Sequence, residues 1–314
     1  MSAGPAEAEE HHQVVIVGGG MAGLSCALEC HDIQLDTIVL EMQAEVGGQI
    51  TEIPFHVRNV AAGVFDDEHP LPQSLQRSVT ILGDRVRRSW PVDRIGLGER
   101  CVESAGRRLA GDAIVIATGV GIRRLPAAAD GAFGGDVTYE LGPELGRFAG
   151  RPVVVIGGGD NAALDALALA GCESPVTLVH RAEHPASRPD LADQLRDSPL
   201  ITQLGGWELD SVGGGERLEE VVLMHNTTAE RRSVKAGGLV VRIGKAPRTE
   251  LLRDQLDTDR SGAVVVDEAL ATSRVGVFAA GDVVAGAYWR IATAMGQGSL
   301  AARSVLRYLA VDPR

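Results

Sequence analysis

Two stretches of the chain, residues 14–29 and 153–170, share one pattern of apolar and polar positions. Each begins with four or five consecutive apolar residues, mostly β-branched, which is typical of a strand buried on both faces of a parallel sheet. Each then passes through a glycine-rich turn into a segment with small and apolar residues at helical spacing. This repeat predicts an α/β fold with two Rossmann-like domains, each doubly wound and three-layered.

The two turns carry the glycine spacing of a dinucleotide-binding loop, GxGxxG in the first copy and GxGxxA in the second. The first glycine makes the tight turn, and the second lets the backbone approach a pyrophosphate. The third small residue lets the helix pack closely on the strand. The helix N-terminus then offers N–H groups to the phosphates. The residues assigned to the two loops are Gly18, Gly20 and Gly23, and Gly157, Gly159, Asp160, Asn161 and Ala162.

The residue that ends the next strand differs between the two copies. Glu41 lies 23 residues after Gly18, the position of an acid that binds ribose hydroxyls. His180 lies at the same offset in the second copy and is followed by Arg181, with Arg188 further on. A cationic strand end suits a ribose 2′-phosphate, which a carboxylate would repel. The alternative is that His180 and Arg181 form a solvated strand end.

Composition narrows the class of protein. The chain has 314 residues and a formal net charge of −12, so nucleic acid and anionic membranes are poor partners. It has no run of 18 apolar residues and begins without the features of a signal peptide, so a cytoplasmic protein is expected. No metal site is predicted. The cysteines, expected to be free thiols without a CxxC pair, are Cys26, Cys30, Cys101 and Cys172.

Further motifs extend over nearly the whole chain. They include LEMQAEVGGQ at 40–49, IVIATG at 114–119, LVHR at 178–181 and VGVFAAGDV at 275–283. In this order, and with the two glycine-rich loops, they resemble the low-molecular-weight thioredoxin reductase family, class II of the pyridine nucleotide-disulfide oxidoreductases. The resemblance implies an FAD domain formed by residues 1–117 and 246–314, with an NADPH domain, residues 121–243, inserted between them. It also implies a homodimer.

The resemblance assigns roles to single residues of the FAD domain. The first loop is expected under the FAD pyrophosphate and Glu41 on the adenosine ribose. Gly48 and Gln49 are expected at the isoalloxazine end, and Asp282 at the ribityl chain or pyrophosphate. Asp282 also follows an apolar strand, where ligands of α/β sheets bind. The other residues assigned to the cofactor are Asn59, Thr118, Gly119 and Gly281.

One departure from the family concerns its redox disulfide. Thioredoxin reductases carry a CxxC pair shortly before the second glycine-rich loop, and this chain has Glu140 and Pro143 in those places. Neither side chain can exchange thiols. Cys26 and Cys30 are an alternative pair, but they lie four residues apart on the expected first helix, where disulfide geometry is poor. We expect these two cysteines to pack in the core.

Two more departures lie in segments that the resemblance places beside the flavin. Trp289 and Arg290 stand where the family has an RQA-like triplet, and they form either a new substrate surface or the packing of a homodimer interface. His56, in a divergent segment after GGQ, is either a proton donor near the flavin or a structural residue. The catalytic residue stays unassigned, with His56, Trp289 and Arg290 as candidates.

Together these features predict an FAD-dependent NAD(P)H oxidoreductase. NADPH is the expected donor, with NADH as an alternative, and the acceptor is a small molecule, a quinone-like compound or oxygen. A second hypothesis is a thioredoxin-reductase-like ferredoxin or flavodoxin–NADP reductase. Ten arginines against five acidic residues between positions 77 and 124 either serve such a partner or form solvated edge strands. A third hypothesis is a flavin-binding regulatory or assembly protein without turnover.

Overall fold

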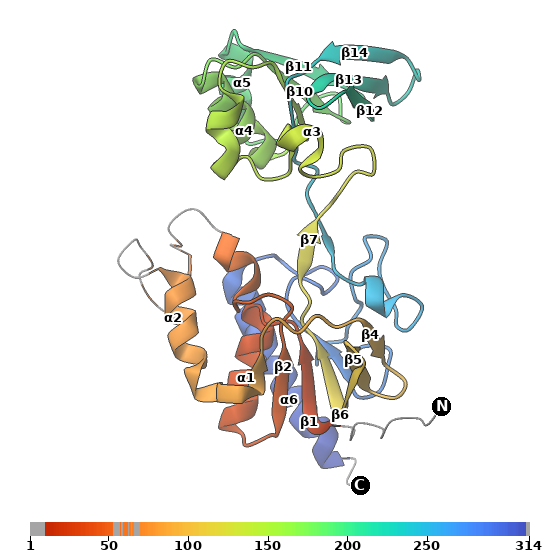
Figure 1. Ribbon diagram of the computed structural model, residues 1–314. Helices are drawn as coiled ribbons and strands as arrows, with labels where there is room; N and C mark the ends of the chain where they lie inside the picture. The colour runs from red at the N-terminus through yellow and green to blue at the C-terminus, as the bar shows by residue number, and fades with distance from the viewer. Residues whose placement is uncertain are drawn as a thin grey trace. The chain divides into compact units, whose positions relative to one another are not determined.

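The computed structural model describes residues 10–52, 57, 59–61, 63, 65 and 70–311. Contacts divide the chain into two compact units, unit 1 with residues 1–121 and 246–314, and unit 2 with residues 122–245 (Figure 1). The sequence placed these divisions at positions 117, 121, 243 and 246. Two short paired strands, β7 (Val120–Ile122) and β16 (Lys245–Pro247), carry the chain from one unit to the other and back.

Unit 1 contains a seven-stranded sheet with the order β3-β2-β1-β6-β5-β4, to which β17 adds by pairing with β6. Five strands are parallel, and β5 and β4 turn back antiparallel at one edge. The strands are β1 (Glu10–Val17), β2 (Thr37–Leu40), β3 (Val86–Arg87), β4 (Arg94–Gly96), β5 (Cys101–Ser104), β6 (Arg107–Ile116) and β17 (Val277–Ala279). The helices are α1 (Met21–Asp32), α2 (Leu71–Ser78) and α6 (Ile291–Val311), with 3-10 turns η1 (Gly48–Glu52), η2 (Val79–Arg85) and η4 (Glu250–Leu252).

The second half of strand β1 is an uninterrupted run of apolar residues, Val14 to Val17. The strand lies between β2 and β6, and its last four residues are buried because the sheet is covered on both faces. Helices α1 and α6 pack against each other on one of these faces (Figure 1). A Cβ on Gly298 of α6 would overlap the carbonyl oxygen of Ala22 of α1, so glycine permits this close approach.

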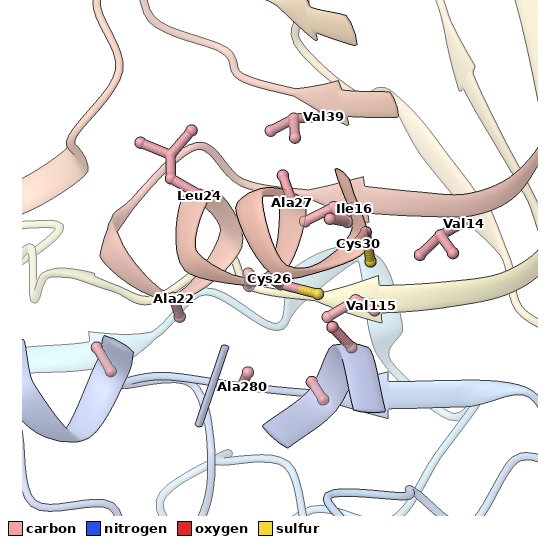
Figure 2. Close-up of a cluster of buried hydrophobic side chains, with 14 of the residues drawn as sticks. Val14, Ile16, Ala22, Leu24, Cys26, Ala27, Cys30, Val39, Val115 and Ala280 are labelled. Atoms are coloured by element: carbon pink, nitrogen blue, oxygen red, sulfur yellow. The ribbon is translucent and has the colours of Figure 1, made fainter. Parts of the chain in front are cut away.

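Cys26 and Cys30 lie fully buried in the core between α1 and the sheet, as expected for packing residues (Figure 2). Their neighbours in this cluster include Ile16 of β1 and Val115 of β6. Small and sulfur-bearing side chains fill the space here because the core contains few aromatic residues.

Unit 2 contains a five-stranded parallel sheet with the order β11-β10-β9-β15-β8. Its strands are β8 (Val137–Thr138), β9 (Val153–Ile156), β10 (Val176–His180), β11 (Ile201–Gly205) and β15 (Gly238–Val241). Its helices are α3 (Ala132–Gly135), α4 (Asp160–Gly171) and α5 (Pro189–Asp197), with the 3-10 turn η3 (Gly142–Phe148). A separate antiparallel sheet of β12 (Trp207–Gly214), β13 (Leu218–His225) and β14 (Arg231–Lys235) follows β11 in the chain.

Asp136 joins the two sheets of unit 2. It is fully buried, and its carboxylate accepts hydrogen bonds from Arg217 at 2.6 Å, Arg151 at 2.8 Å and the Leu218 N–H at 3.1 Å. Burial raises the pKa of Asp136, but the two arginines outweigh it and lower this pKa to about 2. Among the residues that the structure describes, none of the helices has the length and apolar character to cross a bilayer.

Candidate cofactor sites

The first glycine-rich loop lies at the carboxyl ends of β1 and β6. Gly18 has φ 112°, which favours glycine, and a Cβ there would overlap the carbonyl oxygen of Ala117. A Cβ on Gly23 would in turn overlap the carbonyl oxygen of Gly18. Gly20 is the N-cap of α1, and in this described segment no side chain caps the helix. The first N–H groups of α1 therefore remain available to an anion such as a pyrophosphate.

Glu41 follows β2 and lies against this loop with only 6% of its surface exposed. One carboxylate oxygen accepts the Gly19 N–H at 2.7 Å, and the other accepts the Gln43 N–H at 2.8 Å. These charge-assisted hydrogen bonds hold the loop to the end of the strand. Each carboxylate oxygen has two acceptor positions, so Glu41 retains capacity for ribose hydroxyl donors.

Residues that are far apart in the sequence meet at the same edge of the sheet. Gly20 forms a parallel bridge with Gly47, and a Cβ on Gly48 would lie 3.3 Å from the Cα of Gly20. Gln49 Nε2 donates to Asp282 Oδ2 at 2.9 Å, although 233 residues separate them. The structure thus brings the GGQ and GD motifs to the first glycine-rich loop.

Gln297 of α6 is a site residue that the sequence did not indicate. Its Oε1 accepts the Gly281 N–H at 2.7 Å, where Gly281 turns with φ 85° just before Asp282. A Cβ on Gly281 would lie 2.7 Å from the Cβ of Ala22, so this turn also packs on α1. The only sequence signal was a polar residue between two glycines.

Thr118 and Gly119 hold the strand end where the chain leaves unit 1. Thr118 Oγ1 donates to the carbonyl oxygen of Arg248 at 2.8 Å, and Arg248 N–H donates to the carbonyl oxygen of Gly119 at 3.0 Å. Gly119 adopts φ 64°. These two residues therefore tie the outgoing and returning segments of unit 1 together beside the glycine-rich loop.

The candidate catalytic residues have different outcomes. Trp289 is 42% exposed and Tyr288 is 68% exposed, directly before α6. The Arg290 guanidinium stacks on the Tyr288 ring at 4.5 Å and donates to the carbonyl oxygen of Trp289 at 2.8 Å. We call residues 288–290 the aromatic segment. His56 lies outside the described residues, and Asn59 is exposed.

The second glycine-rich loop repeats this construction in unit 2. Gly157 has φ 148°, and a Cβ there would overlap the carbonyl oxygen of Arg242 at the end of β15. Gly159 is the N-cap of α4, and Asp160 is the first residue of that helix. Behind the loop, the buried Ala162 belongs to the core. Asn161, in the first turn of α4, is exposed.

The basic residues at and after the end of β10 differ in burial. His180 is only 4% exposed, and its Nδ1 donates to the carbonyl oxygen of Ala182 at 2.6 Å. Arg181 is exposed. Arg188 is also exposed, but its guanidinium lies 3.8 Å from Asp160 and 3.3 Å from Asp190. Among the described residues, no carboxylate pairs with Arg181, whereas Arg188 is shared between Asp160 and Asp190.

Comparison with known proteins decides the family. The model described as pyridine nucleotide-disulphide oxidoreductase matches residues 12–298. The chain belongs to the pyridine nucleotide-disulphide oxidoreductase family. A thioredoxin reductase of Streptomyces clavuligerus is 31% identical over 304 residues, which cover 95% of this chain and 94% of that protein. A Clostridium pasteurianum protein named "34.2 kDa protein in rubredoxin operon" is 29% identical and covers 96% of this chain and 98% of its own length.

The solved structure of the T. acidophilum thioredoxin reductase supports the same conclusion for the fold. It is 25% identical, has a TM-score of 0.76, and covers 96% of this chain and 99% of its own. The predicted α/β fold with two Rossmann-like domains is thereby confirmed. The chain is a thioredoxin reductase-like flavoprotein oxidoreductase, and such pyridine nucleotide-disulphide oxidoreductases typically use FAD and NAD(P)H.

The residues of this family member fit both cofactors. In each unit, the first glycine of the loop stands where a Cβ would overlap a backbone carbonyl oxygen. The second glycine is the N-cap of the helix that follows. Unit 1 adds the carboxylate of Glu41, and unit 2 adds the exposed guanidinium of Arg181. A carboxylate suits ribose hydroxyls, and a guanidinium suits a phosphate.

All four cysteines of this pyridine nucleotide-disulphide oxidoreductase are free thiols in the structure. The hydrogen bond with Cys30 and burial raise the pKa of the Cys26 thiol well above its usual value. Burial also raises the pKa of Cys101. The hydrogen bond with Cys26 lowers the pKa of the Cys30 thiol. Because the thiolate is the reactive form, the Cys26 and Cys101 thiols are poor nucleophiles, and Cys30 is fully buried. Glu140 is exposed after β8, and Pro143 lies in η3.

Proposed function

We propose that the protein oxidises NADPH and passes the electrons through FAD to an external acceptor that is not a disulfide. The observation that carries this proposal is the placement of the cysteines. Glu140 and Pro143 occupy the segment where the sequence comparison expected a redox pair, and Cys26 and Cys30 are sealed in the core. A thiol that solvent and partner cannot reach cannot relay electrons by exchange.

FAD, when bound, accepts a hydride from the nicotinamide and passes on one or two electrons. The chain's own residues bind and orient. In this proposal the N–H groups at the start of α1 hold the pyrophosphate, and Glu41 holds the ribose. The Gln49–Asp282 pair fixes the edge of the sheet toward the rest of the cofactor. A quinone-like acceptor would take up two electrons and two protons. The hydride of NADPH supplies both electrons and one proton, and solvent supplies the other proton.

The aromatic segment supports a planar small-molecule acceptor. Tyr288 and Trp289 present exposed rings just before α6. The same helix carries Gln297, which binds the turn before Asp282 at the candidate FAD site. The guanidinium of Arg290 is already oriented by Tyr288, so an aromatic molecule would meet a stacked and positively charged surface. A homodimer interface is the competing proposal for the same residues.

NADPH is the proposed donor because of the charge at the end of β10. Arg181 is exposed at that end, and Arg188 follows in the next loop. A guanidinium makes charge-assisted hydrogen bonds to a phosphate dianion. Ala182 follows Arg181, and Arg188 is shared with Asp160 and Asp190, so we propose a moderate preference over NADH.

A protein acceptor is the second candidate function. The observation that favours it is the Clostridium pasteurianum relative, which is named for its place in a rubredoxin operon. The arginine-rich stretch favours it less, because several of these arginines pair with acids of this chain. Such pairs are Arg87–Glu10, Arg94–Glu103 and Arg124–Asp130.

A panel of acceptors tests the proposed function. NADPH oxidation would be followed with a soluble quinone, a dye, oxygen, an aromatic disulfide, and thioredoxin, with rubredoxin or ferredoxin plus cytochrome c in a separate arm. We expect turnover with quinone or dye to exceed turnover with either disulfide at least tenfold. Faster turnover with thioredoxin would contradict the proposal, and strict dependence on an added iron–sulfur protein would favour the second candidate. A yellow protein without turnover with any acceptor would favour the third hypothesis, a flavin-binding regulatory or assembly protein.

A further inference from the structure

A cavity of about 330 Å³ opens on unit 1 at the amino end of β17. Gly281 and Asp282 of the candidate FAD site follow the carboxyl end of β17, so the cavity lies at the other end of this strand. The cavity lies between the segment 269–278 and the later turns of α6. Its apolar lining includes Ala271, Val275 and Phe278, and its volume is that of a small-molecule site.

One buried polar group without a partner lines this cavity, and a second lies beside it. Ser304 lines it and is only 4% exposed, yet its hydroxyl is buried and has no hydrogen-bond partner in the described part of the chain. Arg100 Nε is likewise buried without a partner among the described residues. The Arg100 Cδ and the Tyr308 hydroxyl would lie 3.0 Å and 2.9 Å from a Cβ on Gly276, which lines the cavity. Unused donors are costly when they stay buried, so they indicate a missing acceptor.

The rim of the cavity is positively charged. Arg274 and Arg307 line it and are exposed, and neither forms an ion pair with any described carboxylate. The lining segment 269–278 contains no acidic residue. Of the two acids directly before it, Asp267 accepts the N–H groups of Ala269 and Ala271 with its Oδ1, each at 2.9 Å, and Glu268 is exposed.

We propose that this cavity binds a small organic anion that carries an apolar or aromatic body. The body would lie against Phe278 and Tyr308, whose rings form an edge-to-face pair with centroids 6.1 Å apart. Its carboxylate or phosphate would be bound by Arg274 and Arg307, with Ser304 as an additional donor. Guanidinium groups bind both kinds of anion in this way, and a mostly apolar lining selects against inorganic ions.

Calorimetric titration tests this site on the purified protein with saturating FAD and NADP⁺, so that both glycine-rich loops are occupied. The probes are 1-naphthyl phosphate, 1-naphthoate and the neutral 1-naphthol. We expect at least one anion to bind ten or more times more tightly than 1-naphthol, and to weaken with added salt. The better of the two anions identifies the acidic group. Equal affinity for all three probes, or no binding of either anion at millimolar concentration, would overturn the proposal.

Variants locate the binding. The double change Arg274→Gln and Arg307→Gln should weaken the anion at least tenfold, whereas Arg232→Gln, an exposed arginine of β14, should leave it unchanged. Ala271→Trp should fill the cavity and abolish binding. Ser304→Ala should weaken the anion without lowering the melting temperature, because its hydroxyl makes no bond to lose. Unchanged affinity in both the arginine double variant and Ala271→Trp would place the anion elsewhere.

Discussion

In the proposed function, single residues at the strand ends bind the cofactors, and Glu41 is the first of them. Its carboxylate fixes Gly19 in the first glycine-rich loop as well as offering acceptors to a ribose. Loss of charge-assisted hydrogen bonds costs about 1.5–3 kcal/mol each. We therefore expect Glu41→Ala to weaken FAD binding about ten- to hundredfold, measured from the recovery of flavin fluorescence on dilution. Unchanged retention of FAD would show that Glu41 is only a packing residue.

In the proposed function, Arg181 is the residue that favours NADPH over NADH. Arg181→Ala should lower kcat/KM for NADPH about ten- to hundredfold, the equivalent of about 1.5–3 kcal/mol of charge-assisted bonding to the 2′-phosphate. NADH, which lacks this phosphate, should be nearly unaffected. Arg188→Ala should have a smaller effect, because Asp160 and Asp190 already share that guanidinium. Equal losses with both cofactors would show that Arg181 does not contact the phosphate.

Among single residues, the sequence alone predicted those site residues that lie at a fixed spacing from a motif. Glu41 could be located by its distance from Gly18, because a strand and a helix of ordinary length separate them. Gln297 could not, because its contact with Gly281 depends on how α6 returns to the sheet. The burial of His180 was equally hidden, since the loop that covers it has no regular periodicity.

Among the elements, the contact between α1 and α6 is sensitive to a single methyl group. A Cβ on Gly298 would overlap the carbonyl oxygen of Ala22, whereas a Cβ on Gly296, two residues earlier, meets nothing within 4 Å. Gly298→Ala should therefore destabilise the protein by about 1–3 kcal/mol, as overpacking does. Gly296→Ala, at an exposed position of α6, should stabilise the protein by about 0.5–1 kcal/mol. Thermal unfolding of the two variants compares them, and a loss of stability in both would contradict close packing at Gly298 alone.

The elements were predictable to different degrees for a physical reason. Strands β1 and β9 are buried on both faces, so their apolar runs are unmistakable. Strands β12 and β13 are only partly buried and β14 is mostly exposed, so their charge-rich sequences lack the apolar runs that mark a buried strand. The link from this antiparallel sheet to the rest of unit 2 depends on Asp136, whose partners lie up to 82 residues away.

Across the whole molecule, buried or half-buried carboxylates make stability depend on acid. Asp136 in unit 2 has its pKa lowered to about 2 by its two arginines against burial, and the hydrogen bond from Arg87 lowers the pKa of Glu10 in unit 1 to about 2. Carboxyl groups of an unfolded chain titrate near pH ~4. The stabilisation is therefore complete above about pH 4.5 and is lost as the pH falls toward 2.

Asp136→Asn should test this acid dependence. At pH 7 it leaves Arg151 and Arg217 without their buried carboxylate and should cost about 3 kcal/mol or more. Near pH 2.5 the cost should shrink, because Asp136 of the unfolded wild type is then protonated while that of the folded protein is still largely ionised, and this favours unfolding of the wild type. Asp130→Asn is the control, since its exposed pair with Arg124 is worth less than about 1 kcal/mol. Urea denaturation at several pH values gives both numbers, and a cost independent of pH would contradict the assignment.

The electron path is the central claim about the whole molecule, because it separates this chain from thioredoxin reductases. Four cysteines remain in the sequence, of which three are fully buried. If none of them carries electrons, the flavin must pass its electrons directly to the acceptor. Replacing Cys26, Cys30, Cys101 and Cys172 with Ala or Ser should cost stability of order 1 kcal/mol per cavity and leave electron transfer intact.

Stopped-flow measurement of this cysteine-free protein tests the claim most directly. The flavin would be reduced with NADPH and then reoxidised with a quinone or dye, and both phases would be compared with those of the wild type. We predict that reduction and reoxidation stay within a few-fold of the wild-type rates. A hundredfold slower reoxidation in a protein that remains folded and yellow would contradict the account and show that a cysteine takes part, with Cys26 and Cys30 as the first pair to restore.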